Sequence, residues 1–137
     1  EDADNKQVQD LKRRVEVINE TAPALAVSIH QNSYPSPDVS GSQIFYFKHS
    51  KEGEEMANTV QKQIENLEGI KNRPIKGNDT YYLLRRTEVP TMIIECGFLS
   101  NQEEATRLAE ESYQETLAKA IADGIEECLR SAGSEND

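Results

Sequence analysis

Apolar residues recur at every third or fourth position in three parts of the chain, which is the spacing of one face of an α-helix. The first part covers residues 6–20 and stops before Pro23, whose ring cannot continue a helix. The second follows Ser50, a favourable N-cap, and we expect Gly69 to end it in a left-handed turn. The third follows a candidate N-cap at Asn101, shows its apolar spacing from Leu117 onward, and predicts a last long helix to about Arg130. The pattern predicts three amphipathic helices.

Unbroken apolar runs, by contrast, are typical of strands that are covered on both faces of a sheet. One run covers residues 24–29 and ends at His30, and another covers residues 91–94 and ends at Glu95. Residues 43–47 are rich in side chains that favour strands, and they predict a third strand. We therefore expect an ionisable residue at the end of two buried strands.

Shorter segments separate these elements. Residues 70–79 are polar and irregular and predict a loop, whereas residues 80–87 predict a short helix. Asn101 and Glu104 have the spacing of a capping box, in which each side chain caps the other residue's backbone N–H. The order of elements predicts a three-layer α/β domain, helix on sheet on helix, with a mostly parallel sheet. Three strands are few for so many helices, so we expect the first strands to lie upstream.

Length and charge narrow the possible functions. The 137 residues have room for one core, and we expect one domain over residues 1–130 and a frayed tail over residues 131–137. The chain holds no apolar run of about 18 residues, so we expect no membrane span. Its 15 basic and 25 acidic residues give a net charge of -10, which repels nucleic acid.

Acidic residues collect at the expected helix ends. We interpret them, Glu103 and Glu104 included, as a solvated surface and not as a metal site. The two cysteines, Cys96 and Cys128, lack C-x-x-C spacing and indicate no disulfide framework. The chain begins without a methionine or an apolar leader, so we expect any secretory signal to lie upstream.

His30 and Glu95 are the candidates for chemistry, because ligands of α/β sheets bind beyond the carboxyl ends of the strands. Each residue also has an ordinary explanation, since such a histidine is more often structural and such a carboxylate can cap a turn. Glu95, however, directly follows three apolar residues, where a carboxylate is costly to desolvate unless it is paired or used. We therefore expect both residues to face one pocket.

Two segments carry a family resemblance. Residues 28–33, Ser-Ile-His-Gln-Asn-Ser, and residues 93–101, Ile-Ile-Glu-Cys-Gly-Phe-Leu-Ser-Asn, are similar to the two C-terminal signatures of zinc-dependent N-acetylmuramoyl-L-alanine amidases. The similarity runs from about Asp4 to Arg130. The stretch between the signatures is too compact for the autoinhibitory helix of the regulated Gram-negative branch. The chain therefore resembles the sporulation or germination type of Gram-positive bacteria.

In that family the histidine of the first signature holds zinc and the glutamate of the second is the catalytic acid and base. The resemblance implies these roles for His30 and Glu95. It implies a Zn²⁺-dependent hydrolase that acts on peptidoglycan, cleaving the amide between N-acetylmuramic acid and L-alanine. It also implies an autolysin outside the cytoplasm, in the cell wall or the spore cortex.

The chain departs from the family pattern in its metal ligands. The family has two further ligands, a histidine in a glycine-rich turn and a glutamate on the next helix, and neither has a counterpart here. His49 follows no such turn, and we do not count it as a ligand. We expect the remaining ligands upstream of residue 1, in a missing N-terminal portion of the same domain. This chain alone is then expected to be inactive.

Two other functions stay open. A hydrolase with Cys96 as nucleophile and His30 as base is one, although a buried, inert thiol is the simpler interpretation. A non-catalytic wall-binding or partner-binding α/β module is the other. Among the remaining residues, Asn32 and either Arg85 or Arg86 are candidates for contacts with the acidic stem peptide. We expect three apolar or aromatic side chains to pack beneath the site, those of Phe98, Leu99 and Tyr82.

Overall fold

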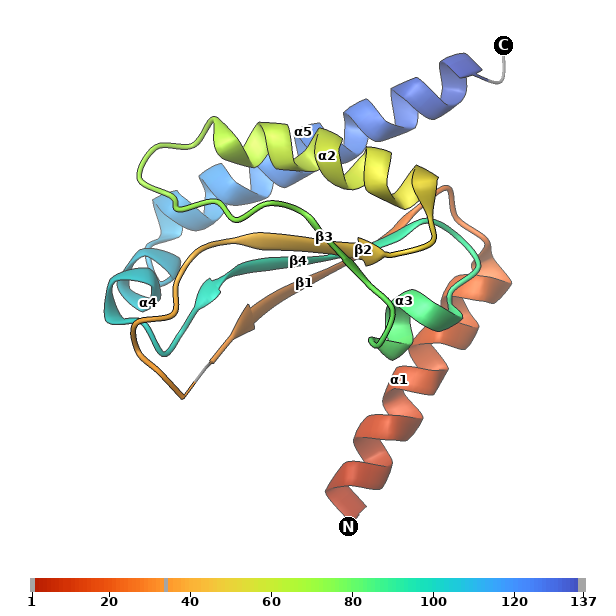
Figure 1. Cartoon of the computed structure of the whole chain (residues 1–137), viewed down its shortest axis with the longest axis horizontal. Coiled ribbons are helices and arrows are strands. Elements are labelled where there is room, and N and C mark those ends of the chain that lie inside the picture. The colour runs from red at the N-terminus through yellow and green to blue at the C-terminus, as the bar shows by residue number, and fades with distance from the viewer. Residues whose placement is uncertain (1, 34, 136–137) are drawn as a thin grey trace.

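The computed structural model describes residues 2–33 and 35–135, and for residues 2–4, 32 and 133–135 it describes the backbone alone. A sheet of four strands lies between helices (Figure 1). The elements in chain order are α1 (Asp2–Thr21), β1 (Ala26–Asn32), β2 (Gln43–Phe47), α2 (Lys51–Glu65), β3 (Lys76–Asn78), α3 (Tyr82–Arg86), β4 (Thr91–Phe98), α4 (Gln102–Leu108) and α5 (Glu111–Glu135). The expected α/β class is confirmed.

The strand order in the sheet is β1-β4-β2-β3. β1 runs parallel to β4 and β2 parallel to β3, while β2 and β4 are antiparallel, so the sheet is mostly parallel, as expected. The loop that we expected over residues 70–79 is wrong in part, because Lys76–Asn78 pair with β2. This strand is short and lies at the edge of the sheet, where polar residues such as Lys76 face water and no apolar run is needed.

Each face of the sheet packs against its own helices. α2 and α5 lie side by side over one face, and α1 and α3 lie at one end of the other face, which they cover only in part (Figure 1). A hydrophobic core lies on each face of the sheet. Successive side chains of β4 point alternately into one core and the other, because neighbouring residues of a strand face opposite sides of the sheet. Met92, Ile94 and Cys96 belong to the core under α2 and α5, whereas Ile93 belongs to the core under α1 and α3.

The observed ends of the helices agree in part with those expected from the sequence. Ser50 caps α2 as expected, because its Oγ accepts a hydrogen bond from the backbone N of Gly53 at 2.9 Å. α2 ends at Glu65, however, and Gly69, with φ of +77°, lies in the turn that follows. The final helical stretch is divided into α4 and α5, and α5 continues through Glu135. Residues 136–137 of the expected tail lie outside the described part, so the domain boundary stays a prediction.

The helix pair α2 and α5 makes a close crossing. A Cβ atom at Gly124 would lie 2.8 Å from Cα of Val60, so this approach requires a glycine. One turn further along α5, Sγ of Cys128 lies 3.5 Å from the carbonyl oxygen of Met56. Within the described part of the chain, no helix is both long enough and apolar enough to cross a membrane.

Candidate active site

His30 and Glu95 lie side by side at the carboxyl ends of two parallel strands. They are register partners in β1 and β4, so their side chains point to the same face of the sheet. This is the face that α1 and α3 partly cover, and both side chains line one hollow of about 240 Å³ there. The structure therefore brings the two candidates together, while their chemical roles remain predictions.

The imidazole of His30 is held by a residue of its own strand. Its Nε2 atom lies 2.9 Å from Oγ of Ser28, which lines the same hollow two positions earlier in β1. Directly after the pair of His30 and Glu95 the register shifts by one residue, and Asn32 pairs with Phe98. Such an irregularity bends the strand ends. His30 is exposed, so a ligand can reach the ring.

Glu95 is 2% exposed on β4, the strand that lies between β1 and β2. It borders the hollow that contains His30 and also a second hollow of about 360 Å³. Phe45 and Tyr81, whose rings meet edge to face at 5.5 Å between centroids, line both hollows as well. Glu95 is therefore a buried carboxylate at the wall common to two cavities.

The second hollow contains a residue that the sequence did not reveal. Arg73 lines it together with Glu95 and Phe98. Its Nε donates a hydrogen bond to the carbonyl oxygen of Ser40 at 2.9 Å, and its guanidinium lies 5.7 Å from the centroid of the Phe98 ring. Arg73 comes from the polar stretch before β3, where neither periodicity nor a motif singles it out.

Glu104 joins three segments beside the second hollow. Its backbone N donates to Oδ1 of Asn101 at 3.1 Å, as the capping box predicts. Its carboxylate does not return to Asn101: Oε1 accepts from the backbone N of Phe98 at 2.9 Å and Oε2 from the backbone N of Gly41 at 2.8 Å. The interpretation of Glu104 as solvated surface is wrong, because it is 7% exposed.

The other candidate residues lie elsewhere. Arg85 and Arg86 are exposed on α3 and line neither of the hollows that contain Glu95. The backbone of Asn32 ends β1 close to the site, but its side chain is outside the described part. Leu99 is 46% exposed and Phe98 lines a cavity, so the expectation that both pack beneath the site is wrong. Tyr82, for which the same packing was expected, is partly buried against the core under α1 and α3.

Cys96 does not belong to the same site as His30. Its side chain is buried in the core under α2 and α5, on the opposite face of the sheet from Glu95. Burial, followed by the charge of Glu95, raises the pKa of the Cys96 thiol to about 11. A buried thiol that stays protonated at neutral pH is a poor nucleophile, and the geometry separates it from the imidazole. The arrangement disfavours the thiol hydrolase.

The described residues fit part of a metal site. His30 offers an accessible imidazole, a common zinc ligand, in a hollow that Glu95 also borders. Among the described residues, however, no three His, Cys, Asp or Glu side chains gather where they could hold a metal ion. A catalytic zinc ion is usually held by three protein ligands. The described residues therefore provide one candidate ligand and a neighbouring carboxylate, and they do not complete a site.

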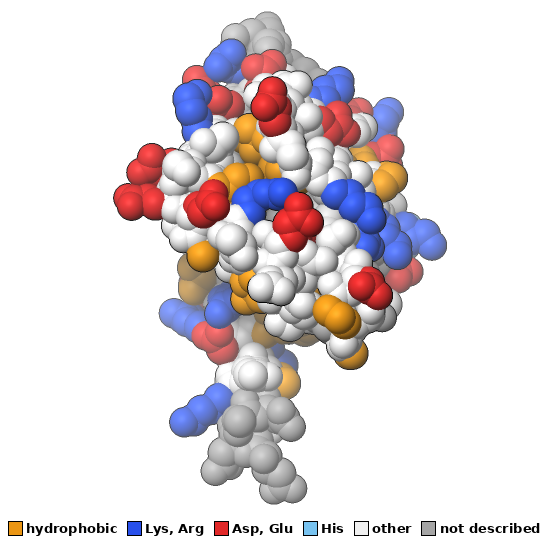
Figure 2. Space-filling model, turned by 90° about the vertical axis from the view of Figure 1, so that its left-hand side faces the viewer, with side chains coloured by type: hydrophobic (Ala, Val, Ile, Leu, Met, Phe, Trp, Pro, Cys, Tyr) orange, Lys and Arg blue, Asp and Glu red, His pale blue; other side chains and the backbone are white. Residues whose placement is uncertain are grey.

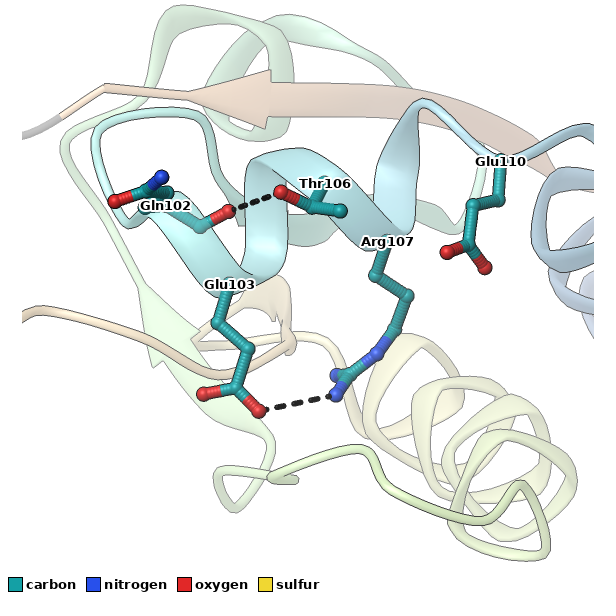
Figure 3. Close-up of a pocket in the computed structure, with 5 residues that line it drawn as sticks. All are labelled: Gln102, Glu103, Thr106, Arg107 and Glu110. Carbon is teal, nitrogen blue, oxygen red and sulfur yellow. Dashed lines mark hydrogen bonds and ion pairs between the residues drawn. The ribbon is translucent and has the colours of Figure 1, made fainter.

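A further hollow, of about 600 Å³, lies along α4 (Figure 3). Three of its polar side chains are engaged within the helix, since Arg107 pairs with Glu103 at 3.6 Å and Oγ1 of Thr106 donates to the carbonyl of Gln102 at 2.9 Å. It shares no lining residue with the hollows around Glu95. On the end of the molecule in Figure 2, basic and acidic side chains are interspersed. Neither feature indicates a second active site.

Comparisons with known proteins give the same family from sequence and from structure. The family model described as N-acetylmuramoyl-L-alanine amidase matches residues 1–127. The germination-specific N-acetylmuramoyl-L-alanine amidase of Bacillus subtilis is 39% identical over 121 residues, which are 88% of this chain and 51% of that protein. The chain thus spans about half the length of this relative.

Solved structures of amidases superpose on the fold. The CwlD amidase of Clostridioides difficile, solved in complex with the GerS lipoprotein, has a TM-score of 0.86 at 36% identity, over 93% of this chain and 65% of that one. The catalytic domain of CwlV from Bacillus (Paenibacillus) polymyxa var. colistinus has a TM-score of 0.81 at 33% identity, over 88% of this chain and 65% of that one. By sequence and by fold, this chain belongs to the N-acetylmuramoyl-L-alanine amidase family.

Proposed function

We propose that the chain carries the acid/base part of a zinc-dependent N-acetylmuramoyl-L-alanine amidase, which cleaves the amide between N-acetylmuramic acid and L-alanine in peptidoglycan. The observation that carries this proposal is the register of β1 and β4, which sets His30 beside Glu95 in one hollow. The family membership gives the reaction class, and the germination-specific relative supports a place in the cell wall or the spore cortex.

Glu95 does the proton transfer in this mechanism. Its buried carboxylate takes a proton from the attacking water and then gives it to the departing amine of L-alanine. His30 is the zinc ligand, and its partner Ser28 orients the ring. Zinc, when bound, supplies Lewis acidity and lowers the pKa of a bound water. Phe45 and Tyr81 restrict water at the wall next to Glu95.

The other zinc ligands lie outside this chain in our proposal. β1 is an edge strand of the described sheet, and Ile29 on it is 58% exposed. An edge strand with an exposed branched side chain suits pairing with a further strand. We place the remaining ligands on a part of the same domain that pairs there, beside His30. Without that part the site has one ligand, and this chain alone is inactive.

The test is amide hydrolysis by the full-length protein that contains this chain, measured as new N-terminal alanine released from purified peptidoglycan. Glu95→Gln keeps the shape of the side chain and removes the base, so we expect at least a 100-fold loss of kcat with zinc still bound. Glu115→Gln, at an exposed position of α5, is the matched control and retains activity.

The amount of bound zinc distinguishes a metal ligand, the role proposed for His30, from the base, the role proposed for Glu95. We expect His30→Ala to lower bound zinc below one equivalent, and His49→Ala, at an exposed position after β2, to leave it unchanged. One equivalent of zinc in the His30→Ala variant would exclude the ligand role.

A non-catalytic binding module is the second candidate. It is favoured by the absence, among the described residues, of any group of three potential ligands. The two functions differ in a simple measurement on the full-length protein. Binding to peptidoglycan without zinc and without release of alanine would support the module over the amidase.

A further inference from the structure

The two hollows around Glu95 place unlike groups on either side of it. The first contains His30, Ser28 and Arg14, whose guanidinium pairs with Asp10 at 2.8 Å. The second contains Arg73, which forms no such pair among the described residues, and Gln43. Since Glu95 lies at the common wall, a substrate that spans both hollows passes the carboxylate at its middle. Its two halves then meet an imidazole on one side and a guanidinium on the other.

Arg73 is built into its position. Its backbone N donates to the carbonyl of Ser42 at 2.9 Å, and its own carbonyl accepts from Nε2 of Gln61 at 2.9 Å. The Nε–H donates to the carbonyl of Ser40, and the guanidinium lies 5.7 Å from the centroid of the Phe98 ring. A Cβ atom at Gly41 would lie 3.2 Å from Nε of Arg73, so the neighbouring loop has a glycine where the arginine passes. The side chain is therefore oriented before any ligand arrives.

The guanidinium of Arg73 has no ion-pair partner among the described residues, although six ion pairs occur elsewhere. With Nε engaged, the two terminal nitrogens are left for a ligand, and a guanidinium fork matches a carboxylate. A half-buried cation beside a cavity in a chain of net charge -10 indicates an anionic ligand group.

We propose that the second hollow is the stem-peptide subsite and that Arg73 binds the free α-carboxylate of the second stem residue, an acidic residue joined onward through its side-chain carboxyl. This inference rests on the proposed amidase function. Two extended residues span at most about 7 Å. When the scissile amide is at Glu95, the carboxylate of the second residue therefore falls inside the hollow that Glu95 and Arg73 both line. The hollow that Arg73 and Glu95 share is of the size that a dipeptide fills.

The experiment uses two synthetic N-acetylmuramoyl tripeptides that differ in one group, the α-carboxylate of the second residue, which is free in one and a carboxamide in the other. We expect the full-length protein to prefer the free carboxylate by about 10- to 100-fold in kcat/KM, the range of a charge-assisted hydrogen bond. In Arg73→Gln this preference falls to within about twofold, through a higher KM for the free acid, and the loss on the carboxamide is smaller because its neutral group forms a weaker bond with the guanidinium. Arg73→Lys retains part of the preference because its charge remains.

The ratio of the two substrates is independent of how much variant is folded. Arg130→Gln, at an exposed position of α5, is the matched control and keeps the full preference. Equal losses on both substrates in Arg73→Gln would show a structural role and overturn the proposal, as would an unchanged preference. If neither substrate is cleaved by the zinc-loaded protein, the amidase function fails. Titration with the free tripeptides then tests the role of Arg73. Tighter binding of the free acid than of the carboxamide, with the difference lost in Arg73→Gln, supports this role, and equal binding of the two tripeptides overturns it.

Discussion

Replacing Glu104 by glutamine tests the buried carboxylate that joins α4 to β4 and to the loop before β2. The native side chain accepts two backbone N–H groups, from Phe98 at 2.9 Å and from Gly41 at 2.8 Å, and is 7% exposed. Glutamine has the same shape but a single acceptor oxygen. Its amide group therefore turns an N–H donor toward one of the two backbone donors.

The magnitude follows from these contacts. A hydrogen bond to a charged group contributes about 1.5–3 kcal/mol, and a buried donor left without a partner costs about 1–3 kcal/mol. Because the amide oxygen still accepts one of the two backbone N–H groups, we expect Glu104→Gln to lower the free energy of unfolding by about 2–4 kcal/mol. The adjacent Glu103 is 84% exposed in its ion pair with Arg107 at 3.6 Å. Glu103→Gln should therefore cost less than about 1 kcal/mol.

Urea unfolding followed by circular dichroism measures both variants at one pH. We expect a lower midpoint for Glu104→Gln with an unchanged dependence on urea, which means lower stability of the same fold. The reasoning is refuted if Glu104→Gln loses no more stability than Glu103→Gln. Since Gly41 lies against Arg73, the folded part of the Glu104→Gln protein should also show weaker discrimination between the two tripeptides.

Three further variants test the cores and a helix end. Gly124→Ala gains about 1 kcal/mol of helix propensity but places its Cβ 2.8 Å from Cα of Val60. Because such overpacking costs about 1–3 kcal/mol, we expect a lower melting temperature. A higher melting temperature would contradict the close crossing of α2 and α5. The pKa of Cys96 is raised to about 11, so its contribution is complete below pH 9 and is lost as the pH rises through 11. The stability of the native protein relative to Cys96→Ala should fall by about 2–3 kcal/mol over that interval, and a constant difference would exclude the shift. Ser50→Ala removes the cap of α2 and should cost about 1 kcal/mol in urea unfolding, with no loss if the cap is dispensable.

The sequence was sufficient for the elements that local pattern determines. Apolar runs located the strands before His30 and Glu95, and the class of fold followed from their order. The pairing of these two residues was not predictable, because register depends on how strands far apart in sequence align. Ser50 behaved as its local motif indicates, since a cap is satisfied within one turn. The resemblance supplied the roles of His30 and Glu95, which geometry alone does not assign.

Residues whose partners are distant in sequence were missed or misread. Glu104 has a perfectly ordinary capping-box position, yet its carboxylate bonds Gly41, 63 residues away. Arg73 lies in a polar stretch, and its importance comes from Ser40 and Phe98, which no window of neighbouring residues contains. The strand Lys76–Asn78 escaped notice because an edge position asks for no apolar side chains.

Because the side chains of β4 point alternately to the two faces of the sheet, the register of this strand decides which side chain lies beside His30. A slip of β4 by one position against β1 would turn Cys96 toward the imidazole and drive a charged carboxylate among the side chains beneath α2 and α5. Such a misaligned molecule would lose both the carboxylate that we propose for hydrolysis and the packing of its larger core. The fraction of molecules that unfold cooperatively should therefore equal the fraction in which His30 and Glu95 are correctly paired.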